Sequence, residues 1–314
     1  MNFAKEIKQE LLSKNIKDKC CKRAFLAGVI RGTGNLFLQD GEYGLEFKLD
    51  SEDGANRITE YLSSLYGFEM REVGYTLNNR YGKEIITLNI HGQGSTKILV
   101  DLGVLIENGN EYAVSLKLFD KVCEKECCIR SFLKGLFVAV GNCILPSAKS
   151  AQTTGYHSEF VFYHYTTALE VAKKLEDAGV KSKITRRKGT FIVYIKSGEE
   201  IKNLVAFLGC PVSVLKITDL MINREIKNNS NRQKNCDLGN LNKQVEASAK
   251  QISAIEKLKS LGEFDKLKKD LKEVAIARLE YQDDTLTELA ERLNLSKSCL
   301  NHRLRKIVHL ASEL

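Results

Sequence analysis

The chain has 314 residues, of which 43% are hydrophobic and 28% charged, and its formal net charge at pH 7 is +8. This composition excludes a disordered class, and the length favours two domains with a connector. No apolar run approaches the roughly 18 residues of a membrane span, and residues 1–19 lack the apolar core of a signal peptide. We therefore expect a cytoplasmic protein whose positive charge favours polyanionic partners.

The nine cysteines favour reduced thiols, because a chain without a secretory signal stays in a reducing compartment. Cys123, Cys127 and Cys128 lie close together, but neither a second pair nor a histidine follows at the spacing of a zinc site. We therefore predict no metal site here. We also predict no cofactor, since the chain has no glycine-rich loop that would cradle a phosphate.

The strongest pattern in the first two thirds is an internal repeat. Residues 20–35 (CCKRAFLAGVIRGTGN) recur as residues 127–142 (CCIRSFLKGLFVAVGN), with half of the positions identical. Each copy predicts an apolar helix with a glycine at the same height, Gly28 or Gly135, and a glycine at its end. A helical glycine costs about 1 kcal/mol relative to alanine, so two equivalent copies indicate helices whose backbones touch.

Strands and helices alternate in a similar order after each copy, so we predict an α+β fold with two αββαββα halves, residues 20–107 and 127–210, in a domain of residues 1–220. The first half has predicted elements at residues 36–39, 45–49, 52–66, 68–77, 84–90 and 93–105. The second has them at 159–164, 166–178, 181–187, 190–196 and 198–208. Joined by the two glycine helices, the halves form a pseudo-twofold saddle.

Residues 26–34 (LAGVIRGTG) and 133–141 (LKGLFVAVG) resemble the two copies of the LAGLIDADG motif of homing endonucleases. In that family, the acid before the final glycine of each copy holds the divalent cation that cleaves DNA. The corresponding residues here are Thr33 and Val140, which are neutral, whereas hard cations require anionic oxygen ligands. We therefore expect the fold without the enzyme activity; an active endonuclease or maturase is the enzymatic alternative.

Basic and polar residues gather at two predicted hairpins of the saddle. They are Tyr75, Asn78, Asn79, Arg80, Tyr81 and Lys83 in the first half, and Lys181, Lys183, Arg186, Arg187 and Lys188 in the second. Such residues suit contacts with a DNA backbone, although exposed hairpin charges also serve solubility alone. Arg31 has two interpretations, a solvated charge near a helix end or a contact with phosphate.

After Pro211 the pattern becomes helical, and we place a second, all-α domain at residues 221–314. We predict helices at residues 212–227, 247–261 and 266–281, and the polar stretch at 228–240 continues a helical connector that is accessible to solvent.

Residues 285–307 (TLTELAERLNLSKSCLNHRLRKI) predict a helix-turn-helix. The apolar spacing assigns its buried scaffold to Leu286, Leu289, Ala290, Leu293, Leu300, Leu304 and Ile307. Asn294 falls in the turn, where asparagine tolerates a left-handed backbone, and Ser296 suits the N-cap of the second helix.

The remaining faces of the second helix carry the predicted DNA-binding residues. These are Ser296, Lys297, Ser298, Asn301, His302, Arg303, Arg305 and Lys306, a segment with four basic residues and no acid. Asn301 and Arg305, or its neighbour Arg303, suit base edges in the major groove, whereas the serines and lysines suit phosphates. An ordinary helical hairpin with a solvated basic face is the alternative.

Further segments make the whole chain similar to the bacterial WhiA family: NR at 223–224, NRQKNC at 231–236, QI at 251–252 and residues 296–307. The resemblance implies a degenerate LAGLIDADG domain without cleavage activity and a helix-turn-helix that supplies most DNA binding. It also implies transcription control of sporulation, or a role in cell division and chromosome segregation. We thus expect a nucleoid-associated regulator that binds double-stranded DNA and other regulatory or division proteins; a protein-interaction scaffold is the non-DNA alternative.

Overall fold

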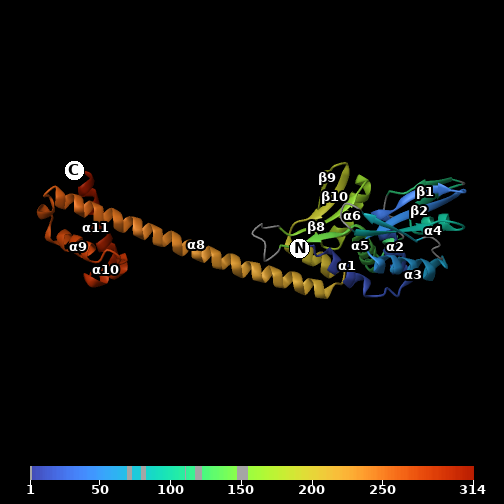
Figure 1. Cartoon of the computed structure of the whole chain (residues 1–314), viewed down its shortest axis with the longest axis horizontal. Coiled ribbons are helices and arrows are strands. Elements are labelled where there is room, and N and C mark those ends of the chain that lie inside the picture. The colour runs from blue at the N-terminus through green and yellow to red at the C-terminus, as the bar shows by residue number, and fades with distance from the viewer. Residues whose placement is uncertain (1, 69–72, 79–82, 110, 117–121, 147–154) are drawn as a thin grey trace. The chain divides into compact units, whose positions relative to one another are not determined.

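The computed structural model describes residues 2–68, 73–78, 83–109, 111–116, 122–146 and 155–314. The chain divides into two units, Met1–Asn223 and Arg224–Leu314 (Figure 1). Among the helices that the structure describes, none combines the length and the apolar character that crossing a bilayer requires.

The N-terminal unit contains the two predicted αββαββα halves. The first half consists of α2 (Lys19–Thr33), β1 (Asn35–Gln39), β2 (Glu42–Leu49), α3 (Glu52–Tyr66), β3 (Val73–Asn78), β4 (Lys83–Ile90) and α4 (Ser95–Asp101). The second consists of α5 (Glu126–Val140), β7 (Asn142–Ile144), β8 (His157–Phe162), α6 (Tyr165–Asp177), β9 (Lys183–Arg187), β10 (Thr190–Ile195) and α7 (Gly198–Phe207). Their antiparallel sheets have equivalent orders, β1-β2-β4-β3 and β7-β8-β10-β9. The duplicated fold is confirmed.

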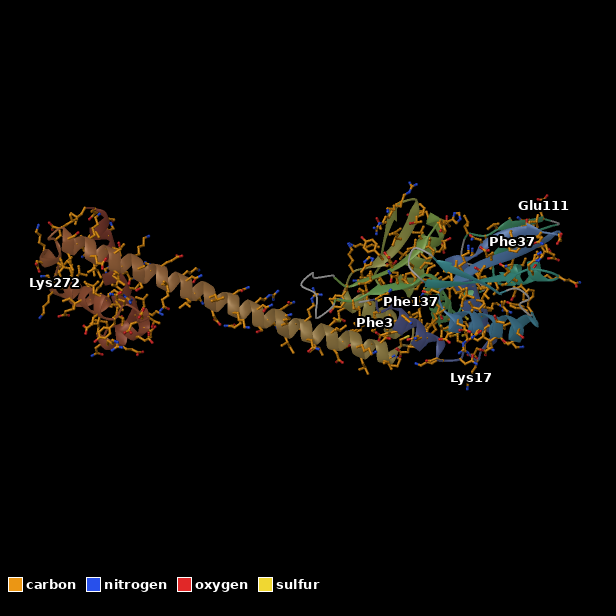
Figure 2. All side chains as sticks on the ribbon, viewed as in Figure 1. Phe3, Lys17, Phe37, Glu111, Phe137 and Lys272 are labelled. Carbon is orange, nitrogen blue, oxygen red and sulfur yellow. The ribbon has the colours of Figure 1, made fainter. Side chains whose placement is uncertain are left out.

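Helices α2 and α5 pack against each other where the two halves meet (Figure 1). A Cβ atom on Gly28 would lie 2.1 Å from the carbonyl oxygen of Phe132, and one on Gly135 would lie 2.0 Å from that of Phe25. Both distances are far inside van der Waals contact, so the predicted approach of the two backbones is confirmed. The fully buried Phe137 belongs to the same core (Figure 2).

Two features of this unit differ from the prediction. The predicted helix at residues 93–105 ends at Asp101, and Gly103, with a φ of 70°, follows it in the left-handed region. A hairpin of β5 (Leu105–Asn108) and β6 (Glu111–Val114) comes next. The second difference is α1 (Ala4–Leu12), which precedes the repeat and buries Ile7 and Leu11 in the shared core.

Helix α8 (Pro211–Ser260) is a single helix of 50 residues, so the helices predicted at 212–227 and 247–261 are parts of one helix that runs through the accessible connector at 228–240. Pro211 suits a first helical turn, where its missing N–H is not needed. Residues 228–240 contain no proline, and Gln233 Nε2 donates to Asp237 Oδ1 one turn later at 3.0 Å. Polar side chains project from this exposed segment (Figure 2). This polar segment thus forms a helix without a buried face. Because no apolar residues recur at helical spacing in it, hydrophobic periodicity does not reveal the helix.

The C-terminal unit has its own core, formed by the end of α8 and three shorter helices. These are α9 (Lys269–Glu280), α10 (Leu286–Arg292) and α11 (Lys297–Ser312), preceded by the short 3-10 helix η2 (Phe264–Lys266). Ile255 and Leu258 of α8 pack with Val274 of α9 and Leu304 of α11. The core holds α11 by one face and leaves the other accessible.

Candidate nucleic-acid interface

The turn between α10 and α11 is built by local hydrogen bonds. Thr285 and Glu288 form a reciprocal capping box at the start of α10. At its end, Asn294 has a φ of 53°, so the predicted left-handed residue is confirmed. The N–H of Leu295 donates to the carbonyl of Ala290 at 2.9 Å and that of Asn294 to Glu291 at 3.1 Å. This pair of hydrogen bonds is the Schellman motif, which stops α10 and redirects the chain.

Helix α11 begins at the predicted cap. The hydroxyl of Ser296 accepts from the N–H of Cys299 at 3.2 Å. One stripe of the helix is buried in the C-terminal core: Leu300, Leu304, Ile307 and Ala311. On α10, Leu289 and Ala290 are buried, and Leu286 and Leu293 pack against them. The seven predicted scaffold residues therefore meet in one core.

The predicted DNA-binding residues separate into two groups by exposure. Six are exposed: Ser296, Lys297, Ser298, His302, Arg305 and Lys306. Asn301 is half-buried beside them, and so is Arg303. The first six and Asn301 follow one another at helical spacing along the face opposite the core, which produces a continuous polar and basic surface.

Arg303 differs from Arg305 in its surroundings. Its Nε lies 3.8 Å from Asp270 Oδ2 of α9, and its side chain is only 23% exposed. An arginine held by a carboxylate on a neighbouring helix positions α11 against α9 and presents less charge to a ligand. The geometry therefore distinguishes Arg305 from Arg303 as a candidate base contact, which the sequence left open.

Sequence reasoning missed one residue that supports this unit. Arg278 of α9 is buried, and its guanidinium donates to the carbonyl of Asp284 at 2.8 Å, just before α10. Burial lowers the pKa of Arg278. The sequence does indicate this burial: Arg278 follows Val274 by four residues and Leu271 by seven, which places its charge on the apolar face of α9.

On the N-terminal unit, the former metal positions lie at the ends of α2 and α5. Thr33 Oγ1 donates back to the carbonyl of Val29 at 3.4 Å. A Cβ atom on Gly32 would lie 3.2 Å from the methyl groups of Val140, so the two helix ends are close together. The hydroxyl and the valine side chain provide no charged ligand for a hard cation.

Arg31 has carbonyl partners that the sequence did not indicate. Its guanidinium donates to the carbonyl oxygens of Gly103 and Ser115 within the N-terminal unit. Burial lowers the pKa of Arg31 to about 10, which leaves it charged at neutral pH. The residue therefore ties the β5–β6 hairpin to α2.

The second predicted hairpin of the saddle is exposed as expected. Lys181, Lys183, Arg186, Arg187 and Lys188 all face solvent, and Lys188 and Gly189 have positive φ in the β9–β10 turn. In the first hairpin, Asn79, Arg80 and Tyr81 lie outside the described residues, and so do the side chains of Tyr75, Asn78 and Lys83. On the sheets, Lys48 Nζ lies 3.2 Å from Glu46 Oε1, and His157 Nε2 lies 2.9 Å from Glu159 Oε2.

Comparison with known proteins shows one family along the chain. Its models are the WhiA N-terminal LAGLIDADG-like domain at residues 19–105, the WhiA LAGLIDADG-like domain at 129–227 and the WhiA C-terminal HTH domain at 230–311. The chain is similar to the probable cell division protein WhiA of Alkaliphilus oremlandii, with 35% identity over 100% of this chain and 98% of the relative. The corresponding protein of Alkaliphilus metalliredigens is 32% identical over 99% of this chain and 98% of the relative.

A solved structure agrees at the level of the fold. The full-length DUF199/WhiA crystal structure from Thermatoga maritima matches with a TM-score of 0.57 and 24% identity, and the match covers 100% of this chain and 99% of that one. The three domain models, the full-length relatives and the duplicated saddle with its helix-turn-helix agree, and the chain belongs to the WhiA family.

Proposed function

We propose that this protein is a sequence-specific DNA-binding regulator without nuclease activity, and that α11 is its recognition helix. The observation that carries the proposal is the exposed face of α11, on which Lys297, Arg305 and Lys306 project with no acidic neighbour among residues 296–306. A helix-turn-helix presents its second helix to the major groove, where such side chains reach bases and phosphates.

The two ends of this face have different proposed tasks. Ser296, Lys297 and Ser298 lie at the N-terminal end of α11, where the helix dipole and free N–H groups favour a phosphate. Asn301 and Arg305 lie further along the helix, where bidentate contacts distinguish adenine and guanine. His302 and Lys306 flank them, and we propose that Lys306 contacts the backbone.

Binding of the full-length protein to genomic DNA fragments, by fluorescence anisotropy at several salt concentrations, tests this function. We expect Arg305→Ala to weaken binding about 10-fold or more. Lys297→Ala should weaken binding to all sequences equally and reduce the slope of log affinity against log salt concentration by about 1. Lys266→Ala is the matched control, because Lys266 is exposed in the same unit but lies outside α11. Equal affinity of Arg305→Ala and wild type would refute the assignment of α11.

We propose further that the saddle no longer cleaves DNA, supported by the neutral residues Thr33 and Val140 at the two former metal positions. Incubation with supercoiled plasmid and Mg²⁺ or Mn²⁺ tests this directly. We expect no saturable nicking. Nicking that disappears in a Thr33→Ala variant would restore the endonuclease alternative.

The cellular role follows from the relatives, which are named as cell division proteins. We propose that this chain acts in cell division, chromosome segregation or the control of sporulation genes, from the cytoplasm and on the nucleoid. Genome-wide crosslinking of the tagged protein tests the role on DNA. A division defect that is fully rescued by a chain lacking residues 286–314 would instead favour a protein-interaction scaffold built on the saddle.

A further inference from the structure

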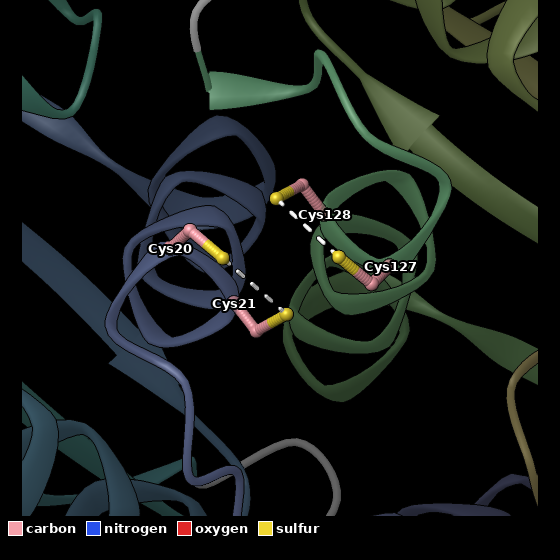
Figure 3. Close-up of side chains that lie close together, drawn as sticks. All are labelled: Cys20, Cys21, Cys127 and Cys128. Atoms are coloured by element: carbon pink, nitrogen blue, oxygen red, sulfur yellow. Dashed lines mark hydrogen bonds between the residues drawn. The ribbon is translucent and has the colours of Figure 1, made fainter.

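Four cysteine side chains meet at the start of the two central helices (Figure 3). Cys20 and Cys21 belong to the first turn of α2, and Cys127 and Cys128 to the first turn of α5. The sulfur atoms of all four lie within 4.8 Å of one another. No second pair follows Cys127 in the sequence, but the repeat supplies one 107 residues before it (127 − 20). The cysteine pair of α5 therefore has partners that the spacing along the chain did not reveal.

The spacing of the sulfurs distinguishes between possible states of the cluster. Cys20 Sγ lies 3.9 Å from Cys21 Sγ, and Cys127 Sγ lies 3.9 Å from Cys128 Sγ. A disulfide requires about 2.05 Å, so the four thiols are reduced in this geometry. Four thiolates around one Zn²⁺ at about 2.3 Å form a tetrahedron with edges of about 3.8 Å. An iron–sulfur cluster places several irons and sulfides between its cysteines and needs a wider cage.

We propose that Cys20, Cys21, Cys127 and Cys128 form a tetrahedral site for one Zn²⁺ that joins the two halves of the saddle. Binding exchanges four S–H bonds for four Zn–S bonds and releases four protons to solvent, so the complex carries a charge of 2−. The ion ties α2 to α5 at their first turns, about two helical turns away from the contact at Gly28 and Gly135. Each half of the repeat supplies one cysteine pair.

Two helix ends and a buried hydroxyl lie at the cysteine cluster. The N-terminal ends of α2 and α5 both lie at the site, and each contributes a partial positive charge that stabilises thiolates. The buried Ser131 hydrogen-bonds to Cys21, as donors around metal ligands commonly do. Cys127 is exposed, so an ion can reach the site from solvent.

The test measures metal in the untagged full-length protein, purified under reducing conditions without oxygen. We expect one zinc per chain by elemental analysis. After removal of zinc by a chelator, Co²⁺ should bind with the thiolate charge-transfer absorption and the visible bands of a tetrahedral site. With zinc bound, an alkylating reagent should spare these four thiols and still modify Cys236, which is exposed on α8.

Cys127→Ser and Cys236→Ser form a matched pair, because each replaces an exposed cysteine on a helix. We expect Cys127→Ser to raise the dissociation constant for zinc by more than about 100-fold, because losing a direct ligand weakens metal binding more than losing a hydrogen-bond partner of a ligand does. Cys236→Ser should leave the dissociation constant unchanged. The proposal is overturned if wild-type protein binds neither Zn²⁺ nor Co²⁺ at these cysteines, or if the two variants bind zinc equally. Iron with acid-labile sulfide, or a disulfide between α2 and α5 in the freshly reduced protein, would equally overturn it.

Discussion

The carbonyl oxygen of Phe132 in α5 occupies the space that a Cβ atom on Gly28 of α2 would need, at 2.1 Å. Gly135 receives the carbonyl oxygen of Phe25 in the same way. The contact is reciprocal, as expected of a duplicated unit whose halves are related by a twofold axis through the helix pair. It involves backbone against backbone, so no change of rotamer can relieve an added methyl group.

Gly28→Ala should therefore destabilise the helix pair by about 3 kcal/mol, because the two helices must separate to admit the methyl group. Gly239→Ala is the control: Gly239 lies in α8, and a Cβ atom added there would meet nothing within 4 Å. At that position alanine should stabilise the helix by up to about 1 kcal/mol. Hydrogen exchange of the amides of α2, α5 and α8 measures both effects locally. Unchanged protection of α2 in Gly28→Ala would contradict the packing described.

Asn294→Ala should destabilise the helix-turn-helix by about 1 kcal/mol, because the short polar side chain of asparagine tolerates a φ of 53° better than the methyl group of alanine does. Asn294→Gly should be close to neutral, since glycine adopts this conformation freely. Amide exchange in α10 and α11 provides the measurement. Equal loss of protection in both variants would show that the asparagine side chain, and not the backbone conformation, holds the turn.

Arg303→Ala should affect mainly the stability of the C-terminal unit, whereas Arg305→Ala should affect mainly DNA affinity. Arg303 lies against Asp270, so its loss should reduce the stability of the unit by less than about 1 kcal/mol, with a smaller effect on DNA affinity. Arg305 is exposed, so its loss should weaken DNA binding and leave stability unchanged. Thermal unfolding and anisotropy titrations of the same preparations separate the two effects. The reverse pattern would assign the base contact to Arg303.

Arg31→Met should loosen the β5–β6 hairpin, because it removes the guanidinium donor of two carbonyl oxygens, those of Gly103 and Ser115. We expect a cost of about 1–3 kcal/mol, the range for losing a buried hydrogen-bond partner. Arg186→Met removes the same charge from an exposed position of β9 and should change stability by less than about 0.5 kcal/mol. Exchange rates of the β5 and β6 amides report the difference; equal rates in the two variants would argue against the tie.

Local patterns determined the larger part of the architecture. The repeat and its glycines predicted two central helices in contact, and the alternation of apolar residues predicted the αββαββα order. The helix-turn-helix was equally predictable, because Asn294 and Ser296 act through hydrogen bonds and backbone conformation within a few residues. Such signals depend on short-range interactions, which a sequence displays directly.

Only the tertiary structure decided which distant groups meet. It joined Cys20 and Cys21 to Cys127 and Cys128, directed Arg31 to the carbonyls of Gly103 and Ser115, and brought Arg303 to Asp270. It also showed that residues 228–240 are part of one helix. This segment is polar and has no buried face, so no apolar periodicity marks it as helical. The physical reason is common to these cases: a side chain's charge and spacing are local properties, but its partner is determined by the packing of elements far apart in the chain.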